Sequence, residues 1–422
     1  MLFLEINEFN PDLMAKAAEE LGLSNLKKLL ALKRSETTTD DKQERFGLDP
    51  WVQWVSIHTG KASGQHGVKH LGDVPQLADE QIWETLSKQG LRCGVWGAMN
   101  ASRGNAKNCT FFFPDPWTFS EAAYPAELNN LLAFPRYYSK NYGDLDARKS
   151  LQTLLRLIWF CLNPRIAIEL LPLAPRILGS VAKHGMHEYL LFVLFDLVNA
   201  KLFAHYYKRT KPDFALLSMN SLAHLQHHKW TSKTVLSEEM KVAFTLFDKA
   251  AGIIFNAVPG DEPVLIANAF TQFCSFDQNE FLHRQKNPEK FLQAAGIDFV
   301  RVEQAMTNDG HVFFDSPESA NKAAEILRKA TVNGKPSFHV EWSDKTPNKI
   351  FFQGIIWESL PENAVMNING KNILFFEQFE VITQRSGSHL QEGHVFSQKI
   401  AVPEKLHNHQ IHDTILNHFH VA

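Results

Sequence analysis

The feature that most constrains this chain is a regular alternation of short, mostly apolar segments with longer segments of helical periodicity. Leu2–Ile6 has the pattern of a short buried strand, and residues 11–32 follow with helical spacing and an alanine-rich face. The same alternation of strand and helix recurs later in the chain, with a strand at Phe214–Met219, a helix at Glu238–Ala257 and a strand at 263–267. Such alternation is typical of a mainly parallel sheet covered by helices on both faces. We therefore predict an α/β fold, with the first and second halves contributing strands to one sheet.

Further segments extend the alternation and divide the chain. A helix is expected at 79–89 and a strand at 92–96, and near the C-terminus a strand at 395–396 precedes a helix at 411–419. These segments complete a core that we assign to residues 1–130, 211–290 and 376–422.

Two segments interrupt this core. Leucine-rich helical spacing dominates residues 131–210, which predicts a helical insertion. From residue 309 the pattern changes to a strand, a helix at 317–329 and a strand at 337–342. We expect a small α+β cap at 291–375.

Composition excludes several classes of protein. The 422 residues carry 43 Lys and Arg against 46 Asp and Glu, a net charge of −3, with no run of five like charges. A duplex nucleic acid is therefore an unlikely class of partner. The four cysteines are far apart and form no CxxC pair, and the N-terminus has no signal-peptide pattern. We expect free thiols and a cytoplasmic location.

Two apolar stretches, 151–178 and 189–207, raise the question of a membrane. Prolines and arginines interrupt the first stretch, and Asp196, Asn199 and Lys201 interrupt the second. We expect neither to cross a bilayer, because a spanning helix needs an uninterrupted apolar run. Buried or cap helices are one interpretation. The mixture of basic and apolar residues in 151–183 leaves a peripheral membrane contact open as the other.

Polar residues directly follow the predicted strands. In parallel sheets, ligands gather at the carboxyl ends of strands. Those loops hold Asn7 and Glu8, then 220–228, then Asn268, and finally the turn at 387–393. The histidines of NSLAHLQHHKW are three and four residues apart, so they share a helix face. That spacing suits a metal site, but His clusters are also common at solvated helix ends, and no HExxH or Cys/His pattern accompanies this one.

Several motifs occur in a characteristic order along the chain. They are the strand end INEFNPDL, the segment from Trp54 to Gly67 with its Thr59–Gly60 and His66–Gly67 pairs, IWETLSKQGLRCGVWG, FFFPDPW, KPDFALLSMNSLAHLQHHKW, FDKAAGIIF, VLIANAF, SGSHLQEG and IHDTILNHF. In this order they resemble the alkaline phosphatase-like superfamily, specifically its type I phosphodiesterase and nucleotide pyrophosphatase branch. The resemblance implies an alkaline phosphatase-like sandwich for the core.

The resemblance also implies a two-metal active site, which this chain keeps only in part. In the family, two divalent ions about 4 Å apart clamp a phosphoryl or sulfuryl group, beside a Thr or Ser nucleophile. The first site keeps His227 and His389 but has Ala223 at the position of its carboxylate. Because these two histidines are retained, we predict that they lie close together and are essential.

The second site of the family is lost more completely. Asn7 replaces its first Asp, Asn268 and Ala269 replace an Asp–His pair, and the nucleophile position falls on Pro50. Neutral amides bring no charge to offset the dehydration of a dication. We therefore expect no pair of divalent ions here. The cofactor stays open between no metal and one divalent ion, zinc or manganese, held by His227 and His389 with an unidentified carboxylate.

The remaining polar residues define a candidate site. A carboxylate near imidazoles suits acid–base chemistry, because their pKa values are pushed apart when they are buried together. Asp49, His227 and His389 are the predicted catalytic residues. The predicted substrate-binding residues, among them a ring of amides, are Asn7, Glu8, Asn220, His224, Asn268 and Arg385.

Two functions remain open. The first is an enzyme that acts by hydrolysis or group transfer on an anionic phosphorylated or glycosyl-type substrate, either a small molecule or a glycan-linked one, without the two-metal mechanism. The second is a non-catalytic binding or scaffold protein that uses the inherited anion pocket.

Overall fold

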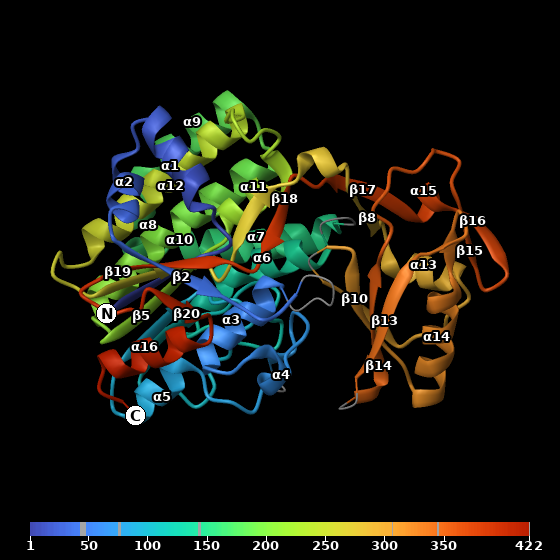
Figure 1. The fold of residues 1–422 in the computed structure, drawn as a ribbon, viewed down its shortest axis with the longest axis horizontal. Helices are drawn as coiled ribbons and strands as arrows, with labels where there is room; N and C mark the ends of the chain where they lie inside the picture. Colours follow the sequence, from blue (N-terminus) through green and yellow to red (C-terminus); the bar gives the residue numbers. More distant parts are fainter. Residues whose placement is uncertain (43–47, 75–76, 142–144, 306, 344–345, 422) are drawn as a thin grey trace. The chain divides into compact units, whose positions relative to one another are not determined.

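The computed structural model describes residues 1–42, 48–74, 77–141, 145–305, 307–343 and 346–421. The chain divides into two compact units (Figure 1). Unit 1 comprises Met1–Pro135, Gln152–Cys274 and Ser386–Ala422, and unit 2 comprises Arg136–Leu151 and Ser275–Arg385. The three-part division made from the sequence stays a prediction, and most of its helical insertion lies in unit 1.

Unit 1 is built on an eight-stranded mixed sheet, in the order β20-β2-β19-β6-β1-β5-β3-β4. The parallel centre is β1 (Leu2–Ile6) between β5 (Phe214–Met219) and β6 (Val264–Ala267), with Leu4 opposite Leu217 and Ile266. Parallel pairing continues through β3 (Cys93–Trp96) to β4 (Cys109–Phe113). The predicted α/β class and the shared sheet of the two halves are confirmed.

The other edge of this sheet is mixed. β19 (Gly393–Gln398) runs antiparallel to both β6 and β2 (Lys33–Thr38), and β20 (Lys405–His407) is parallel to β2. A further two-stranded sheet pairs β7 (Thr271–Cys274) with β18 (Gly387–Leu390) in antiparallel register. This second pairing places His389 opposite Gln272.

Helices cover both faces of the sheet (Figure 1). One group contains α1 (Pro11–Glu20), α2 (Ser24–Leu30), α10 (Glu188–Thr210), α11 (Ser221–Lys229) and α12 (Glu238–Ala257). The other contains α3 (Pro50–Thr59), α4 (Ser63–His66), α5 (Ile82–Lys88) and α16 (Gln410–His418). The remaining helices before α10 are α6 (Leu128–Asn141), α7 (Ala147–Cys161), α8 (Pro164–Leu170), the 3-10 turn Leu171–Leu173 and α9 (Ala174–His184).

One sequence prediction for this unit was wrong. The single helix expected at 11–32 is two helices, because Gly22 takes a left-handed conformation with φ 65° and ends the first. The strand β2 that follows was not predicted. Its sequence, KRSETT, is polar, and only Ser35 and Thr37 are buried.

The apolar stretch at 189–207 forms α10. By length and composition α10 is the one single helix among the described residues that is long and apolar enough to span a membrane, and 61% of its most apolar window is buried in the protein. It packs on α11, α12 and β5. The pair formed by α7 and the segment Pro164–His184 also passes that test, but it bends by 90°.

Unit 2 has a core of its own. β13 (Phe338–Ser343), β14 (Thr346–Gly354), β10 (Asp309–Phe313) and β9 (Arg301–Gln304) form an antiparallel sheet that packs against α14 (Pro317–Lys329). The helix and strands expected from residue 309 onward are present. Its other elements are β8 (Phe281–Gln285), the 3-10 turn Phe276–Gln278, α13 (Pro288–Ala294), β11 (Thr331–Val332), β12 (Lys335–Pro336), β15 (Val365–Ile368), β16 (Lys371–Leu374), α15 (Phe375–Gln378) and β17 (Phe379–Gln384).

Candidate active site

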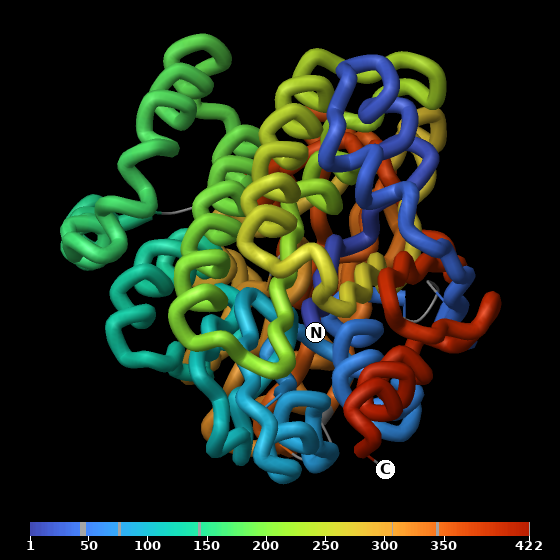
Figure 2. Tube along the Cα trace, turned by 90° about the vertical axis from the view of Figure 1, so that its left-hand side faces the viewer, coloured from blue at the N-terminus to red at the C-terminus, as the bar shows by residue number. Residues whose placement is uncertain are grey.

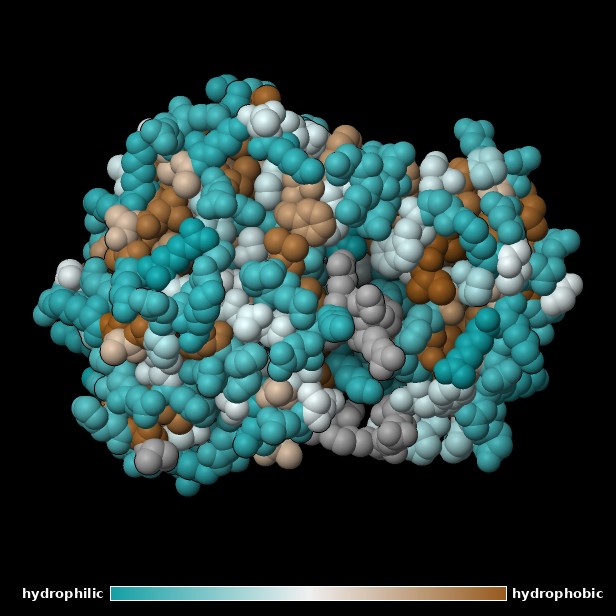
Figure 3. Space-filling model, viewed as in Figure 1, coloured by the Kyte–Doolittle hydropathy of each residue, from teal (hydrophilic) through white to brown (hydrophobic). Residues whose placement is uncertain are grey.

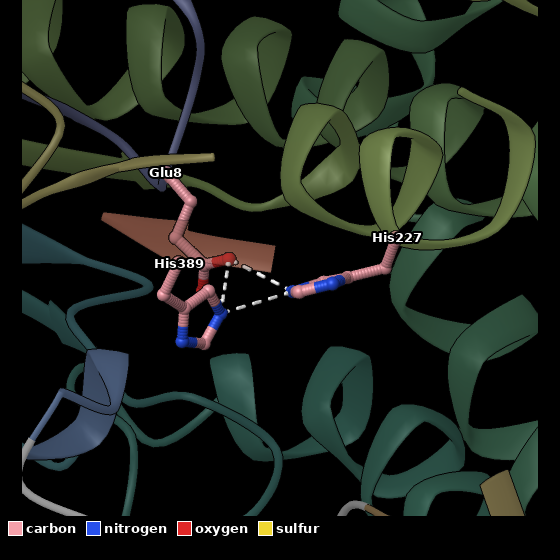
Figure 4. Close-up of side chains that lie close together, drawn as sticks. All are labelled: Glu8, His227 and His389. Atoms are coloured by element: carbon pink, nitrogen blue, oxygen red, sulfur yellow. Dashed lines mark hydrogen bonds and ion pairs between the residues drawn. The ribbon is translucent and has the colours of Figure 1, made fainter. Parts of the chain in front are cut away.

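The loops after β1 and β5 meet the β7–β18 pair in unit 1. Glu8 follows β1, His227 lies near the end of α11, and His389 lies on β18. Their side chains converge although they come from three separate parts of the chain (Figure 4). His227 Nε2 lies 2.9 Å from Glu8 Oε2, His389 Nε2 lies 3.1 Å from the same oxygen, and the two ring nitrogens are 3.3 Å apart.

The backbone conformation of Glu8 directs its carboxylate toward His227 and His389. Glu8 has a φ of 55°, a left-handed conformation that costs a residue with a side chain about 1 to 2 kcal/mol. Three backbone contacts hold it: its N–H donates to the carbonyl of Asn268 at 3.0 Å, and its carbonyl accepts from Gln226 Nε2 at 2.9 Å and the Gln272 N–H at 3.3 Å. Strain held by its surroundings is typical of functional sites.

The outer nitrogens of both rings are fixed by the backbone. His227 Nδ1 lies 2.9 Å from the carbonyl of Gly387, and His389 Nδ1 lies 2.8 Å from the carbonyl of Leu48. A carbonyl only accepts, so each Nδ1 carries a hydrogen and donates it. In the neutral ring, each Nε2 then presents a lone pair to the other and to Glu8. That arrangement is repulsive unless a proton or a metal cation lies between them.

The charge of Glu8 is maintained by its neighbours. Burial by itself raises the pKa of this carboxyl group, but His389 and His227 outweigh burial and hold the pKa well below its usual range. Gln272, fully buried, also donates from Nε2 to Glu8 Oε2. Glu8 is therefore an anion that is 2% exposed and faces two imidazoles.

The three side chains fit a single divalent ion. Their ligand atoms all lie within 4.8 Å of one another, and they form the only such group of three or more among the residues described. Two His and one Glu are a ligand set of catalytic zinc, with bonds of about 2.1 Å that place neighbouring ligand atoms roughly 3.4 Å apart. Metal-bound histidines typically donate their other N–H to a carbonyl, as both rings do here. Glu8 is therefore the carboxylate that lies with His227 and His389, whereas position 223 holds an alanine.

Asn268 and Ala269, where the sequence resemblance placed ligands of a second metal, do not form a metal site. Asn268 is fully buried: its Nδ2 donates to the carbonyl of Phe9 at 2.9 Å and to Thr271 Oγ1 at 3.1 Å, and its Oδ1 accepts from the His394 N–H at 2.8 Å. These hydrogen bonds use both polar atoms of the Asn268 side chain to connect neighbouring loops. Ala269 offers no ligand atom.

Two of the three predicted amides form a network beside Glu8. Asn7 Nδ2 donates to Glu8 Oε1 at 3.0 Å and to Asn220 Oδ1 at 2.7 Å, while Trp54 Nε1 donates to Asn7 Oδ1 at 2.8 Å. Asn7 is buried and Asn220 is half-buried. The bond from Asn7 fixes the amide of Asn220 so that its Nδ2 is the group left to donate to a ligand.

The other predicted residues lie outside the three-residue group. His224 stacks on Phe192 with ring centres 3.8 Å apart, and burial, with a smaller effect of His227, lowers its pKa to about 4. Asp49 precedes α3, directly after the Leu48 carbonyl that holds His389. Arg385 belongs to unit 2, where it approaches Glu280 at 3.9 Å. The roles proposed for these three residues stay predictions.

Sequence reasoning gave no supporting role to Gln226, Gln272 and Gly387. Gln226 and Gly387 lie in the segments NSLAHLQHHKW and SGSHLQEG that the sequence singled out, but no charge or motif distinguishes Gln272. Gly387 is required by close packing, because a Cβ there would lie 2.2 Å from Gln272 Oε1 and 2.7 Å from the carbonyl of Gln226. The one available signal was the position of Gln272, five residues beyond the end of β6.

Comparisons with known proteins give structural likenesses at low identity. No protein-family model matches the chain, and no curated protein matches it. Human ectonucleotide pyrophosphatase/phosphodiesterase 5 is 9% identical, with a TM-score of 0.47 over 100% of this chain and 95% of that chain. Its murine counterpart in complex with AMP is 7% identical, with a TM-score of 0.48 over the same shares.

A bacterial enzyme gives a similar result. Phosphonoacetate hydrolase from Sinorhizobium meliloti 1021, in complex with phosphonoacetate, is 12% identical, with a TM-score of 0.43 over 97% of this chain and 93% of that chain. At these identities and TM-scores, none of the likenesses transfers a residue role. The chemistry of the site rests on this chain's own residues.

Proposed function

We propose that this chain is an enzyme of the alkaline phosphatase-like fold that holds one divalent metal ion on Glu8, His227 and His389 and hydrolyses an anionic phosphorylated small molecule. The observation that carries the proposal is the convergence of two Nε2 atoms on Glu8 Oε2, with both Nδ1 atoms held by backbone carbonyls. The motif order along the chain supports the choice of a phosphorylated substrate.

The chain's own residues would prepare the site for this chemistry. A bound divalent ion supplies a Lewis acid that polarises a phosphoryl oxygen and lowers the pKa of a water ligand. The carbonyls of Gly387 and Leu48 keep both Nε2 atoms turned inward, and Gln272 orients Glu8. Asn220 Nδ2 would donate to a substrate oxygen.

Metal content and turnover together test the proposal. The purified full chain should contain close to one zinc or manganese per molecule by elemental analysis, and it should hydrolyse p-nitrophenyl phosphate or bis-p-nitrophenyl phosphate. His227→Ala and His389→Ala should each remove both properties. His228→Ala is the matched control, because His228 is next to His227 but outside the group. A metal-free chain that binds neither ion on titration contradicts the proposal.

One observation favours a second candidate, a binding protein without turnover. Asn268, at a position where the family holds a metal, is occupied by hydrogen bonds to Phe9, Thr271 and His394. In this case the site would bind an anion without a metal, through hydrogen-bond donors such as Asn220 Nδ2. Stabilisation by phosphate or a nucleotide in a thermal melt, with no metal and no turnover, would identify this function.

A further inference from the structure

Unit 1 also has an exposed apolar surface on α7, α8 and α9, which the proposed chemistry does not use. Its most exposed side chains are Trp159 at 73%, Ile168 at 72% and Leu171 at 72%. On the face drawn in Figure 3, by contrast, hydrophilic residues predominate and apolar ones are scattered. Figure 2 shows the green segment of α8 and α9 at the side of unit 1, with its outer side uncovered by other helices.

The exposed apolar residues follow helical spacing. On α7, Leu155, Ile158 and Trp159 recur at intervals of three and one residues, which places them on one face, and the exposed Leu162 directly follows the helix. Past the 90° bend, Ile168, Leu171 and Leu178 are also exposed, and α9 has no buried residue. We call these seven residues the α7–α9 apolar surface. It is larger than the single apolar side chains that monomers usually expose.

Basic side chains accompany this surface. Arg156, Arg165, Arg176 and Lys183 lie between residues 152 and 187 and are all exposed. Glu169 is the one acidic residue in that range, and it pairs with Lys201 at 2.7 Å. Arg165 lies on α8, while Arg176 and Lys183 are 7 residues apart on α9, about two helical turns, so these two share one side of that helix.

We infer that the α7–α9 apolar surface docks on the surface of an anionic lipid bilayer. Apolar and tryptophan side chains on one face, with arginine and lysine beside them, are typical of helices that lie in the membrane interface. The positive charge complements anionic headgroups. Arg156, Pro172, Pro175 and the bend make the segment unsuited to spanning, whereas they are compatible with lying flat.

Vesicle sedimentation of the full chain tests this inference. The protein should sediment with vesicles of phosphatidylcholine and phosphatidylglycerol, and much less with phosphatidylcholine alone. Replacing Trp159, Leu162 and Leu178 by Ser should abolish binding. Replacing Arg165, Arg176 and Lys183 by Gln should weaken it roughly fivefold for each charge. Val235→Ser, which alters an exposed apolar residue elsewhere in unit 1, is the control and should bind normally.

Fluorescence locates the contact. Brominated lipids should quench Trp159, and Trp159→Phe should lose most of that quenching while still sedimenting with the vesicles. Failure of the wild-type chain to bind anionic vesicles overturns the inference. A dimer that the triple Ser variant converts to a monomer, without vesicle binding, also overturns it and assigns the surface to a second copy of the chain. Enzymatic activity enters none of these measurements, so the inference stands apart from the proposed function.

Discussion

At the scale of single residues, the site depends on which ring nitrogen each imidazole turns toward Glu8. Both Nδ1 atoms are used by carbonyls, so both Nε2 atoms face Glu8. The carboxylate of Glu8 points toward the two imidazoles because the Glu8 backbone adopts a φ of 55°. The neighbouring residue Asn7 is outside this group of three and instead forms hydrogen bonds with Glu8, Asn220 and Trp54.

The first prediction distinguishes the proposed metal ligand, Glu8, from Gln272, which donates a hydrogen bond to it. Glu8→Gln should reduce zinc affinity more than the 10- to 100-fold expected for losing an outer hydrogen bond, because it removes the negative charge between two imidazoles. Gln272→Met, which removes a donor to Glu8, should fall within that 10- to 100-fold range. Isothermal titration with zinc measures both variants. Equal affinities for the two would contradict the assignment of Glu8 as a ligand.

The second prediction concerns Asp196 on α10, whose Oδ2 accepts from the Ser221 N–H at 2.9 Å. Burial raises its pKa to about 6. The carboxyl group of Asp196 therefore holds its proton more tightly in the folded state than in the unfolded state. Because of this, the free energy of unfolding falls as the pH rises from about 4 to about 6, and Asp196 causes no further change above that range. Ionisation then costs the fold on the order of 3 kcal/mol, since a difference of one in pKa corresponds to about 1.4 kcal/mol.

Asp196→Asn should remove that cost and keep an oxygen acceptor for Ser221. We expect the variant to gain stability over the wild type at pH 8 and to gain about half as much at pH 5, in the middle of this pH window. Urea unfolding at both pH values measures the difference. A gain that is equal at pH 5 and pH 8 would show that the carboxyl group is not the source.

At the scale of elements, the site forms where β18 approaches α11. The Ser386 N–H donates to the carbonyl of His227 at 2.8 Å, and Ser386 Oγ donates to the carbonyl of Gln226 at 2.8 Å. Gly387 allows this close approach, because its missing side chain leaves room for Gln272 and the Gln226 carbonyl. The spacing between His227 and His389 is thus set by a strand and a helix packed backbone to backbone.

The third prediction follows from this packing. Gly387→Ala should lower the free energy of unfolding by about 1 to 3 kcal/mol and weaken metal binding, since the added Cβ must displace Gln272 or move β18 away from α11. Gly64→Ala is the control, because no atom lies within 4 Å of a Cβ built there. Denaturant unfolding and zinc titration compare the two variants. Wild-type behaviour of Gly387→Ala in both measurements would exclude this packing.

At the scale of the whole molecule, the site connects three distant parts of unit 1. Glu8, His227 and His389 come from the first strand loop, a middle helix and a C-terminal strand. A ligand that holds all three therefore binds the folded state and not the unfolded chain. Its binding free energy adds to the free energy of unfolding.

The fourth prediction is that zinc stabilises the whole chain. At a free concentration 100 times the dissociation constant, the gain should be about 2.7 kcal/mol, seen as a rise in Tm of several degrees that a chelator reverses. The double variant His227→Ala and His389→Ala should show no rise. A similar rise in the double variant would place the zinc elsewhere in the chain.

The sequence by itself determined the strands at the centre of the sheet and the convergence of two histidines. The strands β1, β5 and β6 are recognisable because local apolar runs between polar loops specify them. The nearness of His227 and His389 was predicted from the resemblance in motif order, and the 3.3 Å between their Nε2 atoms confirms it. Only the tertiary structure decided that Glu8, and not Asn7, joins them. That choice depends on a left-handed backbone held by Gln226, Gln272 and Asn268, contacts between residues more than two hundred positions apart that no local pattern encodes.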